Sequence, residues 1–232
     1  MNIVNKIGLE AEFFVLKKGV LAYPRKLGFQ VDNFLLLGEM RAKPGKTREE
    51  TIGFFFDELA RNLLIAKKQK VEIIFPGYVE ISPELKAETL RAMGTKEIAE
   101  TKNIYRTDIL HLSDDVIENG VLLHTNISNG LHIHFSKEVV HSYFDDKFKE
   151  HTDKKFILRN SEKISLIKKM DDNIFPKYAP PIQLKYRKPG YYEDKNWGFE
   201  YRSLPMIDAF TDIYQLTSLV DFCFTQLELL EK

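Results

Sequence analysis

Pairs of ionisable residues, each pair separated by one residue, stand in three short apolar segments of the chain. They are Glu10/Glu12, His132/His134 and Glu200/Arg202. Carboxylate oxygens are hard ligands for Mg²⁺ or Mn²⁺, and imidazole can complete the sphere of such an ion. A guanidinium group binds phosphate oxygens through two parallel hydrogen bonds. Together these residue types are suited to binding a metal–phosphate complex.

The spacing of two gives each pair a common direction if its segment is a strand. Side chains at i and i+2 of a strand point to the same face of the sheet. Apolar residues alternate with the first pair at Leu9, Ala11 and Phe13, so the opposite face is suited to packing under helices. Glu39 and Arg41 repeat the arrangement in a fourth segment. We therefore expect one shared site if the strands form one sheet.

Each pair also has an ordinary interpretation. A Glu-x-Glu pair on a strand is most often part of a solvated face, and a Glu-x-Arg pair is usually a local ion pair. A His-x-His pair is more often surface or packing. The hypothesis of a site depends on the pairs meeting in space.

Size and composition favour one globular domain over residues 1–232, with a sizeable core. Lys+Arg and Asp+Glu both number 34, and this balance gives no indication of nucleic-acid binding. Cys223 is the only cysteine, which excludes an intramolecular disulfide and a cysteine-rich zinc site and agrees with a cytoplasmic setting. We find no leader segment and no apolar run of about 18 residues, so no membrane association is expected.

Hydrophobic patterns and turn residues predict the secondary structure. Strands are expected at residues 7–16, 20–23, 29–31, 33–41, 71–75, 78–81, 121–124, 131–136, 182–186 and 197–203. Helices are expected at 48–68, after Ser82, at 145–170 and at 207–230. This order favours an α+β fold, a mainly antiparallel sheet backed by helices.

Several local features refine this prediction. Thr47 followed by Glu50 has the spacing of a capping box, and Ser82 precedes a proline suited to the first helical position. Asn129-Gly130 predicts a turn, and residues 176–181 predict a proline-interrupted loop. Residues 191–194 are interpreted either as a flap over the site or as a plain surface loop.

The three segments resemble, in chain order, motifs of the glutamine synthetase-like carboxylate–amine ligases. Residues 7–13 (IGLEAEF) resemble the first-strand motif, residues 129–136 (NGLHIHFS) the Gly-x-His-x-His-x-Ser segment, and residues 199–203 (FEYRS) the late Glu-x-Arg-Ser segment. The most similar branch is the amidoligases, the COOH–NH2 ligase type 2 group of phages and bacteria; glutamate–cysteine ligases are more distant. The resemblance implies a curved half-barrel sheet with helices outside, ATP at one mouth, and two or three Mg²⁺ or Mn²⁺ ions in the middle.

The resemblance also implies roles for single residues. Metal ligands are expected at Glu10, Glu12, His132 and Glu200. His132 is placed close to the nucleotide phosphates, His134 further toward the nucleotide, and Arg202 at the transferred phosphate.

Further candidates come from the segment around Glu39. Glu39, Arg41 and Pro44 resemble a Glu-x-Arg-x-x-Pro motif, which makes Glu39 a further metal ligand or substrate contact and Arg41 a second phosphate contact. Arg187 resembles a phosphate-binding arginine that precedes the late strand. The further central glutamates of glutamine synthetase have few counterparts here. Besides Glu39, only Glu72 and Glu80 are candidates, and Glu80 is the better of these two.

The function implied is an ATP-dependent ligase that forms an amide through an acyl phosphate. Its expected partners are small-molecule or peptide carboxylates and amines, with neither nucleic acid nor membrane, and an open sheet edge could pair two subunits. Two alternatives remain: a guanidino-kinase-like phosphotransferase, and a non-catalytic ATP- or metal-binding module. The sequence has no Gly-x-x-x-x-Gly-Lys-Ser/Thr loop, so a P-loop enzyme is not expected.

Overall fold

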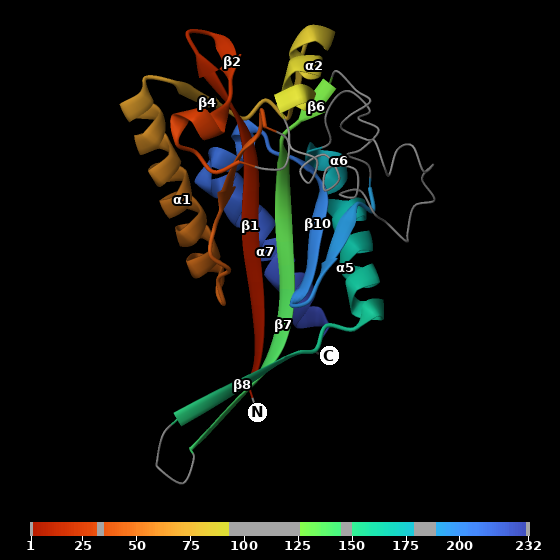
Figure 1. The fold of residues 1–232 in the computed structure, drawn as a ribbon. Helices are drawn as coiled ribbons and strands as arrows, with labels where there is room; N and C mark the ends of the chain where they lie inside the picture. The colour runs from red at the N-terminus through yellow and green to blue at the C-terminus, as the bar shows by residue number, and fades with distance from the viewer. Residues whose placement is uncertain (1, 32–34, 93–125, 145–149, 179–188, 231–232) are drawn as a thin grey trace.

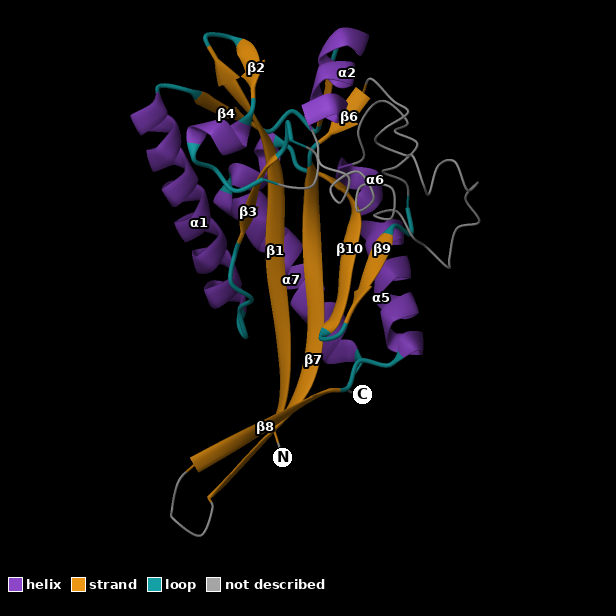
Figure 2. Cartoon of the chain, in the orientation of Figure 1, coloured by secondary structure: helices purple, strands orange, loops and turns teal. Residues whose placement is uncertain are grey.

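A curled antiparallel sheet, shaped as a half-barrel and backed by helices, dominates the computed structural model (Figures 1 and 2). The expected α+β class is thereby confirmed. The structure describes residues 2–31, 35–92, 126–144, 150–178 and 189–230. Within these ranges no helix is long and apolar enough to cross a membrane.

Most of the described strands belong to one sheet, in which β1, β7 and β10 lie side by side at the centre. The strands are β1 (Asn2–Lys17), β2 (Val20–Ala22), β3 (Gly38–Arg41), β4 (Glu72–Ile74), β5 (Tyr78–Glu80), β6 (Asn126–Ser128), β7 (Gly130–Phe144), β8 (Glu150–Phe156), β9 (Tyr192–Lys195) and β10 (Gly198–Pro205). The main path runs β2-β1-β7-β10-β9, while β3 and β4 also pair with β1, and β8 pairs with β7. Strands β5 and β6 form a separate two-stranded sheet.

Helices cover one face of this sheet. They are α1 (Arg48–Gln69), α5 (Asn160–Asn173), α6 (Phe175–Tyr178) and α7 (Ile213–Leu229), with 3₁₀ turns η1 (Pro24–Leu27) and η2 (Asp208–Thr211). Helix α2 (Pro83–Ala92) is separate from them, and its leucines pack against a second apolar cluster that includes Phe14. Figure 1 shows α7 crossing behind β1 and β7, with α1 on one side and α5 on the other. The sheet thus has a helix-covered face and an opposite face.

The period of two in β1 produces the core. Ile7, Leu9, Ala11 and Phe13 are buried in one apolar cluster together with the inner face of α7. The buried residues of α7 recur at intervals of three and four, as a helix with one core-facing stripe requires. Cys223 is among them, with its sulfur 3.9 Å from the Met170 sulfur, so this cysteine packs in the core.

Thr47 caps α1 as expected, but the Glu50 side chain bonds to the residue before the cap rather than to the cap itself. The Thr47 side chain accepts a hydrogen bond from the Glu50 backbone N–H, at 3.2 Å. The Glu50 carboxylate accepts from the backbone of Lys46, one residue before the cap, at 2.8 Å. Ser82 caps α2 in the same manner, accepting from the Leu85 N–H at 3.1 Å.

The helix expected at 145–170 is confirmed only from Asn160 onward, and its first part is wrong. Residues Glu150–Phe156 form β8, which pairs with the outer half of β7, and the helix begins only at Asn160. The charged composition of this segment is compatible with either structure, and pairing with β7 decides it. Residues 145–149 lie outside the described part of the chain.

Other elements differ in extent. Among the described residues of the strand expected at 33–41, only Gly38–Arg41 form a strand, and the described residues of the loop expected at 176–181 belong to the short helix Phe175–Tyr178. The helix expected at 207–230 divides at Asp212, whose carboxylate caps α7 by accepting from two backbone N–H groups. The strands expected at 121–124 and 182–186 lie outside the described residues.

Two expectations near the site are also wrong. Asn129 does not form a hairpin turn, because it joins β6 to β7, which belong to different sheets. Its buried amide donates to the carbonyl oxygens of Glu12, at 3.2 Å, and Met206, at 2.8 Å. The segment interpreted as a flap or surface loop is strand β9, with Tyr191 and Tyr192 buried.

Candidate metal centre

The strand register brings the sequence pairs together on one face of the sheet. Glu10 of β1 lies opposite His132 of β7, and His134 of β7 lies opposite Glu200 of β10. On the other side of β1, Glu10 lies opposite Arg41 of β3 and Glu12 opposite Glu39. The apolar residues between them face the helices, so the ionisable residues share the opposite face.

The imidazole of His132 is at the centre of this group and is fully buried. Its Nδ1 lies 3.0 Å from Glu200 Oε1 and 3.4 Å from Glu10 Oε1, and its Nε2 lies 3.6 Å from Glu12 Oε1. One ligand atom each from Glu10, His132 and Glu200 lie within 4.8 Å of one another. Adjacent ligands of an octahedral Mg²⁺ are about 3 Å apart, so this spacing is suited to a divalent ion.

The second oxygens of the same two carboxylates face His134. Its Nε2 lies 3.6 Å from Glu10 Oε2 and 3.7 Å from Glu200 Oε2. These distances are too long for hydrogen bonds, and Nε2 is buried with no hydrogen-bond partner among the described residues. A buried ring nitrogen facing two carboxylate oxygens fits a cation when it presents its lone pair. Glu10 and Glu200 could thus each offer one oxygen toward His132 and one toward His134.

Glu12 is held beneath this centre by the start of β7. Its Oε2 accepts a hydrogen bond from the Gly130 backbone N–H at 2.5 Å. Asn129, next to Gly130, fixes the backbone of Glu12 through its side-chain amide. The Asn129-Gly130 dipeptide therefore positions a candidate ligand.

Cationic side chains surround the carboxylates. Arg202 Nη1 lies 2.7 Å from Glu200 Oε1 and 2.9 Å from Glu193 Oε2, while Lys195 Nζ lies 3.1 Å from Glu200 and 2.8 Å from Glu193. On the other flank, Arg41 Nη2 lies 2.6 Å from Glu39 Oε2. Arg202 is buried whereas Arg41 is largely exposed, so the Arg202 charge is the less screened by solvent.

The local fields keep both central carboxylates ionised. Burial raises the pKa of Glu10, but hydrogen bonds with His132 and Glu39 outweigh it and hold the pKa below its ordinary range. Burial also raises the pKa of Glu200, and the charges of Arg202 and His132 overcome this, leaving the pKa well below the usual value. Both groups are therefore available as anionic ligands at neutral pH.

The two imidazoles are shifted in opposite directions. Burial and the Arg202 charge lower the pKa of His132, but the surrounding glutamates prevail and raise it above its usual value. Burial lowers the pKa of His134, and the nearby carboxylates do not compensate. The raised pKa favours a proton on His132, whose charge would offset part of the negative charge of the glutamates, and the lowered pKa favours the neutral form of His134.

The structure thus gathers most of the candidate residues, with some additions and exceptions. Those it brings together are Glu10, Glu12, Glu39, Arg41, His132, His134, Glu200 and Arg202. Glu193 and Lys195 belong to the same group and are not among the predicted site residues, although they too are spaced by two; Glu193 falls in the segment interpreted as a flap or loop, and Lys195 directly follows it. Arg187 lies outside the described residues.

The remaining glutamate candidates lie elsewhere. Glu72 is exposed on β4, opposite Leu16 near the far end of β1. Glu80 is exposed on β5, in the two-stranded sheet. Of the candidates for the additional central carboxylate, the structure brings Glu39 to the group.

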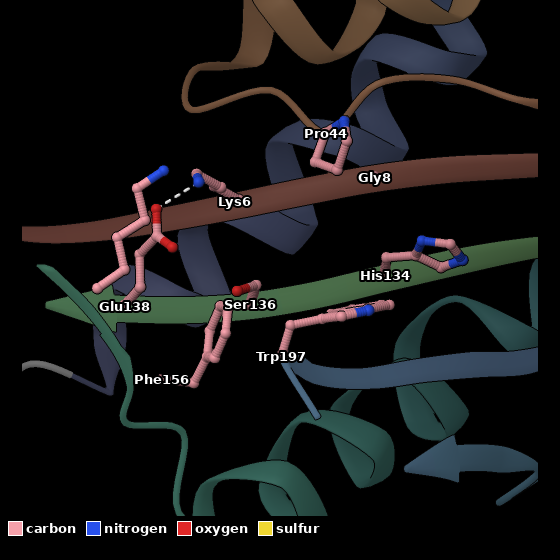
Figure 3. A pocket seen from close by; sticks show the side chains of 9 residues that line it. Lys6, Gly8, Pro44, His134, Ser136, Glu138, Phe156 and Trp197 are labelled. Atoms are coloured by element: carbon pink, nitrogen blue, oxygen red, sulfur yellow. Dashed lines mark ion pairs between the residues drawn. The ribbon is translucent and has the colours of Figure 1, made fainter. Parts of the chain in front are cut away.

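A pocket of about 310 Å³ adjoins the centre on the side of His134 (Figure 3). The Trp197 ring packs against the His134 ring, with centroids 5.1 Å apart. The Ser136 hydroxyl also lines the pocket, and its oxygen is buried with no hydrogen-bond partner among the described residues. An ion pair between Lys6 and Glu138 lies toward the end opposite His134 (Figure 3). The pocket thus combines an aromatic wall with a buried polar group available to a ligand.

No protein-family model, curated protein or solved structure matches this chain at a significant level.

Proposed function

We propose that this protein is an ATP-dependent carboxylate–amine ligase that uses divalent metal ions. The observation that carries the proposal is the buried Glu10–His132–Glu200 cluster, with the Arg202 guanidinium 2.7 Å from Glu200. Such a cluster offers both anionic ligands for cations and a fixed cation for phosphate. The resemblance of the three motifs to the carboxylate–amine ligases supports the same function.

The reaction begins with attack of a substrate carboxylate on the γ-phosphorus of ATP, which gives an acyl phosphate and ADP. An amine then attacks the acyl carbon, forming an amide and releasing phosphate. Both reactants of the first step are anions, and divalent ions held by Glu10, Glu12, His132 and Glu200 would supply the neutralising charge. Arg202 would bind the oxygens of the transferred phosphoryl group, on which charge is spread in the transition state.

The polarity of the site also suits this chemistry. No protein nucleophile is needed, and Cys223, the only cysteine, is buried in the apolar core. Glu193 and Glu200 hold Arg202 before phosphate arrives, so that its guanidinium is already oriented. Preorientation of this kind lowers the cost of stabilising developing charge.

The pocket beside His134 is our candidate for the nucleoside of ATP. Its volume of about 310 Å³ is at the lower end of the range of ligand sites, about 300–1,000 Å³. This volume suits a nucleoside better than a whole nucleoside triphosphate. A base packed on Trp197 would direct the phosphates past His134 toward the carboxylates. Ser136 would offer its hydroxyl to the base or the ribose.

The test is ADP release in the presence of Mg²⁺, ATP and panels of carboxylic acids and amines, with products identified by mass. We expect Glu12→Gln and Arg202→Ala to abolish turnover, whereas Glu72→Gln, at an exposed carboxylate of β4, should match wild type. If both site variants retain full metal dependence and turnover, the assignment is wrong.

The products also separate the alternatives. A product with the mass of acid plus amine less water supports the ligase. A phosphorylated guanidine would indicate a phosphotransferase instead. ATP–Mg²⁺ binding with no ADP formed across the panels would favour a binding module.

A further inference from the structure

A partly buried polar contact lies directly behind the proposed metal centre, on the helix side of the sheet. Tyr201 stands between Glu200 and Arg202 in β10 and points into the core, where it is fully buried. Its hydroxyl donates to Asp171 Oδ1 of α5 at 2.7 Å. The same oxygen accepts from the backbone N–H of Gly190 at 3.0 Å. One carboxylate oxygen thus joins α5, β10 and the residues leading into β9.

These contacts surround an irregularity in β10. Tyr201 lies opposite Ile133 and Leu204 opposite Leu131, so β10 advances three residues while β7 advances two. The extra residue is a β-bulge, a feature that locally redirects side chains. The bulge lies at Arg202 and Ser203, so it affects the position of the Arg202 side chain.

The bulge takes its hydrogen bonds from Tyr191. The Tyr191 carbonyl accepts from the Arg202 N–H at 2.9 Å. The Tyr191 N–H donates to the Ser203 hydroxyl oxygen at 3.0 Å. Tyr191 directly follows Gly190, the residue that Asp171 holds, so a shift at Gly190 would be transmitted to the bulge.

Burial of Asp171 has an energetic cost. Burial raises its pKa to about 6, although the bonds from Tyr201 and Gly190 act in the opposite direction. A partly buried carboxylate whose hydrogen bonds with Tyr201 and Gly190 bring no positive charge is a weak source of stability. Its clearer contribution is geometric, since it supplies one acceptor for two donors on different elements.

We propose that Asp171 is a positioning residue for the metal centre. By holding the Tyr201 hydroxyl and the Gly190 amide, it fixes the β10 bulge and thereby the directions of Glu200 and Arg202. The inference rests on the proposed metal centre for its functional meaning, but the clamp itself can be measured without any metal.

The first measurement is amide hydrogen exchange of the peptide spanning residues 199–203 in metal-free protein. Asp171→Ala and Tyr201→Phe should raise exchange in this peptide, because each removes the Tyr201–Asp171 hydrogen bond. Asp171→Asn retains an acceptor oxygen and should remain close to wild type. Asp172→Asn, at the exposed neighbouring carboxylate, is the matched control and should not differ.

The second measurement is Mn²⁺ affinity by titration, well below the unfolding temperature of each variant. Partners that orient metal ligands typically contribute about tenfold or more to affinity, and we expect a loss of about tenfold in Asp171→Ala, with recovery in Asp171→Asn. A purely structural role would lower the unfolding temperature and leave the affinity of the folded protein unchanged.

The outcomes separate the two proposals. Unchanged exchange at residues 199–203 in Asp171→Ala overturns the clamp, whether or not Mn²⁺ binds. Wild-type Mn²⁺ affinity in Asp171→Ala overturns the positioning role while leaving the metal centre intact. Failure of the wild-type protein to bind Mn²⁺ removes the metal centre, and with it the role of Asp171 in positioning ligands.

Discussion

Opposite shifts of two neighbouring imidazoles define the chemistry of the centre at the residue scale. His132 has its pKa raised by three glutamates, whereas His134 has its pKa lowered by burial. A metal ligand must present a lone pair, so His134 is ready to bind a cation at neutral pH and His132 must first lose a proton. The two positions should therefore respond differently to pH.

Metal binding should release a proton from His132. Because its pKa is raised, lowering the pH increases competition by protons, and Mn²⁺ affinity should rise as the pH is raised from about 6 to about 8. Calorimetric titration in two buffers of different ionisation enthalpy measures the protons released. A His132→Gln variant should bind more weakly and show less release; equal release from this variant would contradict the assignment.

Trp197 should contribute to nucleotide binding and leave metal binding unchanged. Stacking of a base on an aromatic side chain is worth about 1–3 kcal/mol, so Trp197→Ala should weaken the binding of a non-hydrolysable ATP analogue about tenfold or more. Mn²⁺ affinity in the absence of nucleotide should stay at the wild-type value. Tyr214→Ala, at an exposed aromatic residue of α7, serves as the control. An unaltered affinity in Trp197→Ala would show that the nucleoside binds elsewhere.

At the scale of the elements, the sequence predicts which side chains share a face of a strand, because this alternation depends on that strand alone. The alternation in residues 7–13 and 131–135 required no partner to interpret. The flap interpretation failed because only pairing with β10 makes residues 192–195 a strand. The role of Asn129 likewise depends on its contacts with Glu12 and Met206, which are distant from it in the sequence. Local patterns therefore predict the candidate ligands, and long-range pairing adds the charges of Glu193 and Lys195.

Gly198 is required where β10 begins. A Cβ at this position would collide with the backbone carbonyl of Phe135 in β7, and the residue has φ +154°. The obstacle is backbone in a paired strand, so it cannot rotate away. We expect Gly198→Ala to destabilise the fold by more than about 2 kcal/mol, measured by denaturant unfolding. Gly53→Ala is the control, since a Cβ there meets nothing within 4 Å.

Asp171→Asn should change the pH dependence of stability. The folded-state pKa of about 6 lies above the ordinary value of 3.8, so the folded protein binds this proton more tightly than the unfolded chain. Wild-type stability therefore falls as the pH rises from about 4 to about 6, and the loss persists above that range.

The asparagine variant lacks this titration. Its unfolding temperature relative to wild type should rise from acidic pH to about pH 7. Thermal unfolding of both proteins across this range tests the sign. A constant difference would show that Asp171 has a similar pKa in the folded and unfolded states.

At the scale of the whole molecule, the proposed centre draws its candidate ligands from strands that are far apart in the sequence. Glu10, His132 and Glu200 belong to β1, β7 and β10, which are adjacent only in the complete sheet. An ion bound here interacts with the folded state and much less with the unfolded chain. Binding should therefore stabilise the whole fold by mass action.

Mn²⁺ should raise the unfolding temperature. At a concentration about 100 times the dissociation constant, the gain is about 2.7 kcal/mol, and for a chain of this size that corresponds to roughly 5–10 °C. Chelation should reverse the shift, and Glu200→Gln should reduce it strongly. An equal shift in this variant would place the stabilising ion at another site.

The central place of β7 has a consequence for how the molecule is assembled during synthesis. Its histidines leave the ribosome after β1 but well before β10, whose Glu200 lies 68 positions beyond His132. A nascent chain that ends before residue 200 has two of the three ligands and lacks the strand that closes the centre. Metal binding at the proposed centre would thus require that synthesis has passed β10 and that β1, β7 and β10 have paired.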